Sequence, residues 1–346
     1  MTGPGTFAAY RSRVVAARDL SPDDVAVWRR IQTGSEALAS PFYSATFTTA
    51  VASVGIDARV GIFADDHGPR AFLPFQFATR MHRFLGAAER VGGEMSDYFG
   101  LIADRGVRLT PAAVLRACRL NSFYLTHLDE TQQEFGLTGG KPEVGHRIVI
   151  GGDAAAFWAQ LQRENKRFVS DLKRRESNLV KRHGPLRFEF SAACPGPELD
   201  RLVAEKRAQY ARTGALDALR DDGSIRLLMA LAQSSDPSCR GVLSTLHAGE
   251  TWVASHFGLL GSSVLHYWFP VYSADLREFS PGHLLIRAII NISGEVGVRT
   301  IDRGAGDQQA KREFANARHS YFRDLWHRAN LPGLGVHAYH ALRWRM

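Results

Sequence analysis

Cysteine is scarce in this chain, with three residues among 346. Cys118, Cys194 and Cys239 lie far apart, and no further cysteine or histidine stands near them at metal-site spacing. This pattern argues against a disulfide framework and against a structural zinc site, and it predicts the reducing environment of the cytoplasm. The 13 histidines form no H-x-x-x-H or H-E-x-x-H arrangement, so we expect no metal centre.

Long hydrophobic runs are also missing. No run of 18 apolar residues occurs, so no membrane span is predicted. Residues 1–13 lack the charged start and apolar core of a secretory signal. Neither a G-x-S-x-G elbow nor a cysteine beside a helix start is present, which argues against a covalent nucleophile.

Positive charge is plentiful, and it is concentrated in one segment. The formal net charge is +8, and the stretch from Arg163 to Arg182 contributes eight basic and three acidic side chains, a net +5. Three interpretations remain open for this stretch: a solvated helix face, attraction of an acidic donor or acceptor, or contact with the phosphates of tRNA. Nucleic acid is the least favoured of the three, because no aromatic residues are interleaved with the basic face.

The apolar pattern predicts an α/β protein of two parts. Strand-like runs alternate with short helical patterns up to Gly151-Gly152, where we place the boundary between residues 1–150 and 151–346. The longest helical pattern follows, from Asp153 to His183. Its apolar residues recur on one stripe, which requires a partner surface; they are Phe157, Leu161, Phe168, Leu172 and Leu179.

The most informative stretch runs from residue 280 to residue 292. Ser280 is a suitable N-cap, Pro281 suits the first helical turn, and Gly282 would let another group approach the backbone. Strand-like segments at 252–260 and 263–272 precede this helix, and a short one at 298–303 follows it. A helix that starts directly after a strand presents free N–H groups and a positive dipole end, which suits a phosphate. An ordinary capped helix is the alternative.

Several segments together resemble the BioF2-like acetyltransferase domain, a branch of the GNAT superfamily that includes CelD/BcsL-type proteins. The resemblance covers roughly residues 150–320 and extends more weakly into the first half. The matching segments are W252-V-A-S-H-F-G258, Y267-W268 with Tyr272, S280-P-G-H-L-L285, D302-R-G-A-G-D307, K311-R-E-F314 and Q209-Y-A-R-T-G214. Ala310 stands where the family usually has tyrosine, and the superfamily's Q/R-x-x-G-x-G/A loop is absent as such.

The resemblance implies two GNAT-like halves with mixed central sheets flanked by helices. It also implies an acyltransferase that uses acetyl-CoA or another acyl-CoA as donor. The acceptor would be an amine or hydroxyl of a sugar or small precursor, and the branch suggests exopolysaccharide or cellulose biosynthesis. Two alternatives remain: a transferase related to FemABX that uses aminoacyl-tRNA, or a non-catalytic binding protein on the same fold.

Candidate site residues follow from this resemblance and from the chemistry of acyl transfer. We expect the donor phosphates at the helix start, which comprises Ser280, Pro281, Gly282, His283 and Leu284. Asp302 and one of His256 or His266 would deprotonate or orient the acceptor, although strand histidines are more often packed core residues. Lys311 would offset negative charge, or it is a solvated helix lysine. The remaining candidates would line the acceptor pocket: Asp97, Tyr98, Tyr267 and Tyr272.

Overall fold

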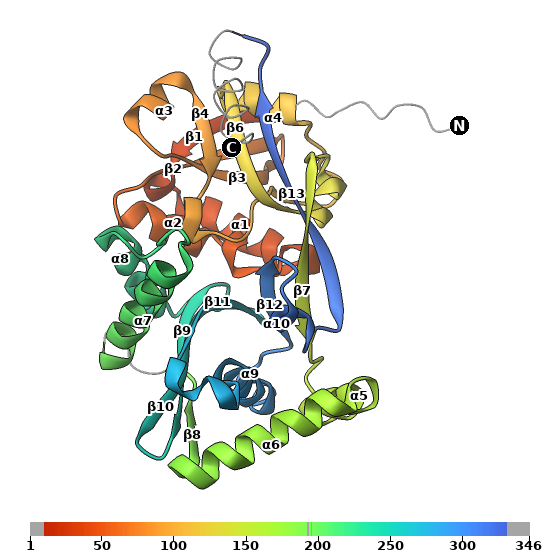
Figure 1. Ribbon diagram of the computed structural model, residues 1–346. Helices are drawn as coiled ribbons and strands as arrows, with labels where there is room; N and C mark the ends of the chain where they lie inside the picture. Colours follow the sequence, from red (N-terminus) through yellow and green to blue (C-terminus); the bar gives the residue numbers. More distant parts are fainter. Residues whose placement is uncertain (1–9, 192–193, 195, 331–346) are drawn as a thin grey trace. The chain divides into compact units, whose positions relative to one another are not determined.

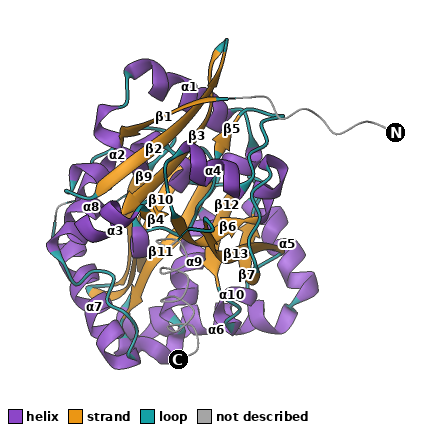
Figure 2. Ribbon diagram, turned by 90° about the horizontal axis from the view of Figure 1, so that it is seen from above, coloured by secondary structure: helices purple, strands orange, loops and turns teal. Residues whose placement is uncertain are grey.

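The structure is a computed structural model that describes residues 10–191, 194 and 196–330. Its chain contacts divide it into two compact units, residues 1–144 with 319–346 (unit 1) and residues 145–318 (unit 2). Both contain strands and helices, so the expected α/β class is confirmed (Figure 2). The expected boundary at residue 150 lies six residues beyond this division, and the chain after residue 318 groups with the N-terminal residues.

Unit 1 contains a mixed sheet in the order β1-β2-β3-β4-β6-β13, with β5 beside β3. Its first three strands are antiparallel, and β4 and β6 are parallel. The strands are β1 (Arg11–Ala16), β2 (Asp57–Asp65), β3 (Gly68–Phe77), β4 (Ala87–Arg90), β5 (Ile102–Ala103), β6 (Ser122–Asp129) and β13 (Ala317–His327).

The helices of unit 1 begin where the sequence provides caps. The Ser21 hydroxyl accepts a hydrogen bond from the Asp24 N–H in a capping box, and Thr110 caps α4 through the Ala113 N–H. The helices are α1 (Pro22–Thr33), α2 (Ala45–Ser53), α3 (Arg80–Leu85) and α4 (Pro111–Ala117).

Unit 2 contains a sheet in the order β7-β12-β11-β10-β9-β8. All neighbouring strands are antiparallel except β11 and β12, which are parallel. The strands are β7 (Lys141–Val149), β8 (Leu186–Glu189), β9 (Arg240–Ala248), β10 (Thr251–Gly261), β11 (Val264–Tyr272) and β12 (Thr300–Ala305). Residues 145–149 of β7 belong to unit 2, and the strand begins in unit 1.

The helices of unit 2 cover both faces of this sheet. Figure 1 shows α7 and α8 on one side of strands β9 to β11 and α9 on the other. Buried side chains of α5, α6 and α9 form one apolar cluster with the sheet, whereas those of α7 and α8 lie outside that cluster. The helices are α5 (Ala154–Glu164), α6 (Lys166–His183), α7 (Pro197–Thr213), α8 (Asp222–Ala232), α9 (Pro281–Asn291) and α10 (Gln309–Arg312).

The long helix expected at 153–183 is interrupted at Asn165. The backbone there leaves the helical region at φ −142° and ψ 62°, and the Asn165 side chain accepts from the Phe168 N–H as a new N-cap. The predicted apolar stripe is nevertheless turned inward, because four of its members are buried and Phe168 is half-buried. Asn165 therefore starts a second helix, and the apolar residues of both helices still face the core.

Two findings concern the described residues alone. In that part of the chain no helix has both the length and the apolar character needed to cross a membrane. No group of three or more histidine, cysteine or acidic side chains there could hold a metal ion.

Candidate functional site

The candidate site lies where β11 and β12 part. The two strands pair at only three positions, Val264–His266 with Thr300–Asp302. β11 then continues to Tyr272 and β12 to Ala305 without further pairing between them. Helix α9 connects the strands and begins beyond the carboxyl end of β11 (Figure 1). Crevices at the carboxyl ends of parallel strands are where α/β sheets bind ligands.

The start of α9 differs from the expected cap. Ser280 has the left-handed backbone angles φ 54° and ψ 57°, and its side chain caps no N–H group. The N-cap role predicted for its hydroxyl is therefore wrong, because capping serine needs the extended conformation. Its Oγ instead accepts a hydrogen bond from Arg175 at 2.9 Å. The Ser280 carbonyl accepts from the N–H groups of His283 and Leu284 at 2.9 and 3.2 Å.

Gly282 leaves the first turn of α9 accessible. Within the described residues its N–H makes no hydrogen bond, as expected for the second position of a helix. A Cβ placed on Gly282 would meet only a ring carbon of Tyr272, at 3.8 Å. Tyr272 is 43% exposed and so forms an open wall beside this turn. The side chains of Pro281 and Leu284 are buried in the core and do not face a ligand.

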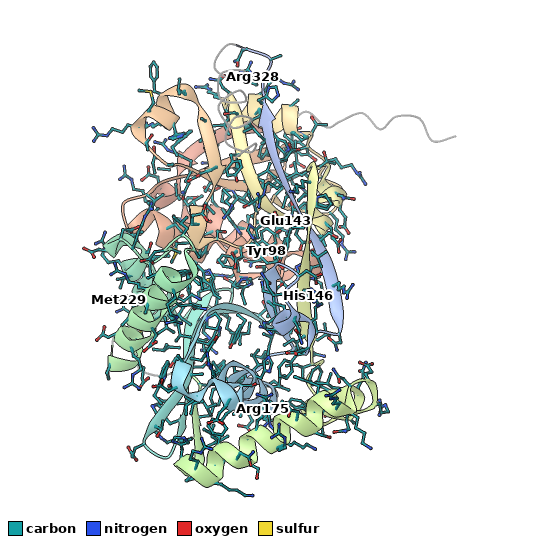
Figure 3. The ribbon with its side chains drawn as sticks, viewed as in Figure 1. Tyr98, Glu143, His146, Arg175, Met229 and Arg328 are labelled. Atoms are coloured by element: carbon teal, nitrogen blue, oxygen red, sulfur yellow. The ribbon has the colours of Figure 1, made fainter. Side chains whose placement is uncertain are left out.

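A basic groove adjoins this helix start. It encloses about 640 Å³. Its walls are Asn165, Arg167, Phe168, Ser170, Asp171, Arg174, Arg175, Gln309 and Glu313. Arg175 reaches from α6 to the start of α9, where it donates to Ser280 and to the Glu278 carbonyl (Figure 3). Hydrogen bonds from Arg174 and Arg175 lower the pKa of the Asp171 carboxyl.

The charges around α9 favour an anion at its start. Its first turn contains no acidic side chain, although carboxylates are the usual partners of a helix N-terminus. A cation, Arg175, lies there instead. The groove and the uncapped turn together provide room, an N–H donor and positive charge for a phosphate.

His283, in the first turn of α9, contacts two residues of the groove wall, Phe168 and Glu313. Its Nε2 lies 3.0 Å from the Glu313 carboxylate, and its ring packs against Phe168 and Phe314. Burial lowers the pKa of His283, although the nearby Glu313 charge opposes the shift. A lowered pKa favours the neutral imidazole, which adds no positive charge to the start of α9.

Asp302 and His266 meet at the last paired position of β11 and β12. Both are 1% exposed, and His266 Nδ1 lies 3.7 Å from Asp302 Oδ1. Asp302 also accepts hydrogen bonds from the Arg147 Nε at 3.0 Å and from the Gly304 N–H at 2.8 Å. The structure therefore brings the predicted aspartate and one predicted histidine together, with the buried carboxylate balanced by Arg147.

His256 has the environment of a packed residue. Its ring is 0% exposed and stacks on Tyr267 with centroids 4.2 Å apart. Burial, together with the charge of His266, lowers the pKa of His256 to about 3. A group of such low basicity is a poor acceptor for the proton of an amine. Tyr267 lies beneath Arg303, whose guanidinium carbon is 5.0 Å from the ring centroid.

Lys311 and Asp97 have local roles in the structure. The Lys311 ammonium donates to the Ala305 carbonyl just after β12 and so secures the end of that strand. In unit 1, Asp97 lies 4.0 Å from His127, and Tyr98 is a buried aromatic that packs against Tyr43 (Figure 3).

Three residues of this region were not predicted individually. Arg147 and Arg175 come from a strand and from the basic helix, and their contacts depend on residues more than 100 positions away. Lys206 is the third, and the sequence did contain a signal for it. It follows Leu199 and Leu202 at helical spacing and so occupies the buried stripe of α7.

Residues 166–312 match the family model described as an acetyltransferase (GNAT) domain. That segment runs from the start of α6 to the end of α10. It contains the start of α9, the parting strands and all the groove residues except Asn165 and Glu313. No curated protein matches the chain.

Solved structures with similar folds extend over most of the chain. FemX is similar with a TM-score of 0.54 and 12% identity, covering 80% of this chain and 90% of its own. The C-terminal domain of a protein assigned as a lysylphosphatidylglycerol synthetase from Agrobacterium fabrum has a TM-score of 0.52 and 13% identity, with 92% and 96% covered. A tandem GNAT protein from the clavulanic acid biosynthesis pathway has a TM-score of 0.51 and 10% identity, with 93% and 100% covered.

The comparisons support the GNAT superfamily and an acyltransferase type of function. At these identities the solved structures show a common fold alone. None of these descriptions names the BioF2-like branch, cellulose or an exopolysaccharide, so those narrower expectations stay predictions.

Proposed function

We propose that this protein transfers an acyl group from an acyl-CoA to an amine or hydroxyl of a sugar or small precursor. One observation carries the proposal: the parting of β11 and β12 beside an uncapped helix start and an arginine-lined groove. The diphosphate of the donor would bind the Gly282 N–H and the groove arginines Arg174 and Arg175. The acyl thioester would then enter the gap between the parted strands.

The residues beside the gap suit direct transfer. The acceptor nitrogen or oxygen attacks the thioester carbonyl carbon, the C–S bond breaks, and the thiolate leaves and takes up a proton. His266, oriented by Asp302, is the group we assign to remove the proton from the acceptor. Orientation of the two substrates in the gap would supply much of the rate acceleration.

Isothermal calorimetry with acetyl-CoA and longer acyl-CoAs tests the donor. We expect binding in the micromolar range, and Arg175→Met should weaken it about 10-fold because charge-assisted contacts to phosphate are lost. Arg163→Met is the matched control, since Arg163 is exposed on α5 and does not line the groove. Absence of binding by the unmodified protein at high micromolar acyl-CoA would reject this donor.

Aminoacyl-tRNA is the second candidate donor, favoured by the arginines of the groove and by the FemX-like fold. A gel shift with bulk tRNA distinguishes the two donors. A band that disappears in the double variant Arg174→Ala, Arg175→Ala, together with no acyl-CoA binding, would favour tRNA. Failure to bind either donor would leave the non-catalytic interpretation.

A further inference from the structure

The edge of β11 that faces away from β10 contains a proline, Pro270, beyond the last residue that pairs with β12. The hydrogen bond from the Ser273 N–H to the Val253 carbonyl, 3.0 Å long, sets the phase of the ladder between β11 and β10. Backbone groups alternate in direction along a strand, so those of Phe269 and Val271 face β10 and those of Pro270 face the opposite side. β12 no longer pairs with β11 there, so the Pro270 backbone faces the unpaired edge of the strand, on the side of the gap between the parted strands.

Proline at this edge leaves a donor missing. An ordinary residue would present both an N–H and a C=O to the gap, whereas Pro270 presents only its C=O. Proline is tolerated in a sheet at such an unpaired edge, which explains why the strand survives there.

The Lys206 side chain lies at the unpaired edge of β11 beside Pro270. It comes from α7, is 8% exposed, and donates from Nζ to the Pro270 carbonyl at 3.2 Å and to Gln209 Oε1 at 3.1 Å. The ammonium also lies 5.2 Å from the centroid of the Tyr210 ring. Its charge is one of the influences that lower the pKa of His256, so it acts on the same part of the gap.

A count of donors leaves one N–H of Lys206 available. An ammonium group has three N–H donors, and the described residues accept two of them. No carboxylate forms an ion pair with Lys206 in the described part of the chain, so its buried charge lacks an anionic partner there. Burial lowers the pKa of Lys206 to about 8, which leaves the group mostly protonated at pH 7.

We propose that the Lys206 ammonium replaces the N–H that Pro270 lacks, and that it donates to the carbonyl oxygen of the acyl group being transferred. This inference rests on the proposed acyltransferase function, because the carbonyl belongs to the acyl donor. As the acceptor attacks, the carbonyl π electrons move onto that oxygen, and the cation stabilises the developing charge. The electrons then return as the C–S bond breaks, and Lys206 keeps its protons throughout.

Two ligands that differ only in the carbonyl test this contact. Acetyl-CoA has the thioester oxygen, whereas S-ethyl-CoA is a thioether of similar size without it. We expect the unmodified protein to bind acetyl-CoA about 10-fold more tightly by calorimetry, as one charge-assisted hydrogen bond predicts. Lys206→Met should bring the ratio of the two Kd values close to one, and Lys206→Arg should retain most of the preference.

The control is Lys181→Met, because Lys181 is exposed on α6 and does not line the groove. That variant should keep the 10-fold ratio. Equal affinity of the unmodified protein for the two ligands, or a preference that persists in Lys206→Met, overturns the role of Lys206 and leaves the proposed function intact. Failure to bind either ligand rejects the acyl-CoA donor and this inference with it.

A second measurement avoids dependence on the folding of Lys206→Met. Infrared spectra of ¹³C-carbonyl acetyl-CoA bound to the unmodified protein should show the thioester band at lower frequency than in water. Lys206→Gln, which removes the charge from a side chain that remains polar, should reduce that shift. An unshifted band, or the same shift in Lys206→Gln, contradicts the contact.

Discussion

Each unit contains a pair of parallel strands that stop pairing after three residues, and the edge beyond the last pair differs between the units. In unit 1, β4 and β6 are parallel over three residue pairs, and a Thr-Pro helix start at residue 110 lies between them in the chain. In unit 2, β11 and β12 are parallel over three pairs, and the Ser-Pro start at residue 280 lies between them. The two arrangements differ beyond the third pair.

In unit 1 the edge of β6 is closed by the chain itself. Phe99 forms a parallel bridge with Leu128, and its N–H donates to the His127 carbonyl at 3.0 Å. Its ring packs 4.7 Å from Phe123 and 5.9 Å from Trp326, between centroids. In unit 2 no described strand pairs with β11 at the corresponding edge, and the Lys206 ammonium donates to the Pro270 carbonyl there. Aromatic residues therefore cover the strand edge in unit 1, whereas a charged side chain contacts it in unit 2.

The largest expected loss of stability comes from removing the Phe99 ring that covers the edge of β6 in unit 1. Phe99→Ala removes a fully packed ring, so we expect the free energy of unfolding to fall by about 4 kcal/mol in urea titrations. Phe84→Ala is the matched control, because that ring is 84% exposed and its loss should change stability by less than about 0.5 kcal/mol. Similar losses in the two variants would show that Phe99 does not close a core.

The next effect concerns the charge balance in unit 2. Arg147→Met leaves the Asp302 carboxylate buried without its cation, and we expect a loss of about 3 kcal/mol in the same titration. The double variant Arg147→Met, Asp302→Asn should recover part of that loss, because the uncompensated charge is gone. A double variant as unstable as the sum of the single variants would contradict this account.

The two helix starts predict smaller and unequal losses of stability. Thr110 is a true N-cap, so Thr110→Ala should cost about 1 kcal/mol in thermal or urea unfolding. Ser280 caps nothing, so Ser280→Ala should cost less than about 0.5 kcal/mol. Ser280→Gly should be neutral or slightly stabilising, because glycine adopts φ 54° without strain. Equal costs of the two alanine variants would contradict this difference between the two helix starts.

The smallest effect is a pH dependence in unit 2. A hydrogen bond with His146, 2.8 Å long, lowers the pKa of the Asp307 carboxyl, with a further contribution from Arg312. A carboxyl whose pKa is lower in the folded state stabilises the protein above its ordinary pKa, and this contribution disappears as pH falls through the folded value. The Tm difference between the unmodified protein and Asp307→Asn should therefore be small at pH 7 and vanish as the pH falls through the lowered pKa. A Tm difference that grows on acidification would contradict a stabilising role of the ionised Asp307 carboxylate.

Local features of the site could be predicted because they depend on neighbours in the chain. The strands before and after residue 280, the helix between them and the inward stripe of α6 all appear at the expected places. Hydrophobic periodicity and helix-start residues encode these directly. The sequence also identified Asp302 and His266, whose roles stay predictions although the structure brings the two side chains together.

The failures came from positions where distant residues decide the conformation. Ser280 resembles a cap in every local respect, yet Arg175, 105 positions earlier, holds its hydroxyl. His256 was one of two candidate bases, and its stacking on Tyr267 agrees with the alternative of a packed strand histidine.

The sequence alone determined the succession of strands and helices, the concentration of positive charge on α6 and the glycine that bares the start of α9. These properties reside in single segments, where backbone preference and side-chain spacing act over a few residues. Only the tertiary structure decided that β11 and β12 part after three pairs, that Arg147 balances Asp302, and that Lys206 reaches the Pro270 edge. Each of those depends on burial and on contacts between remote segments, and the pKa of a buried side chain depends on the groups that folding places around it.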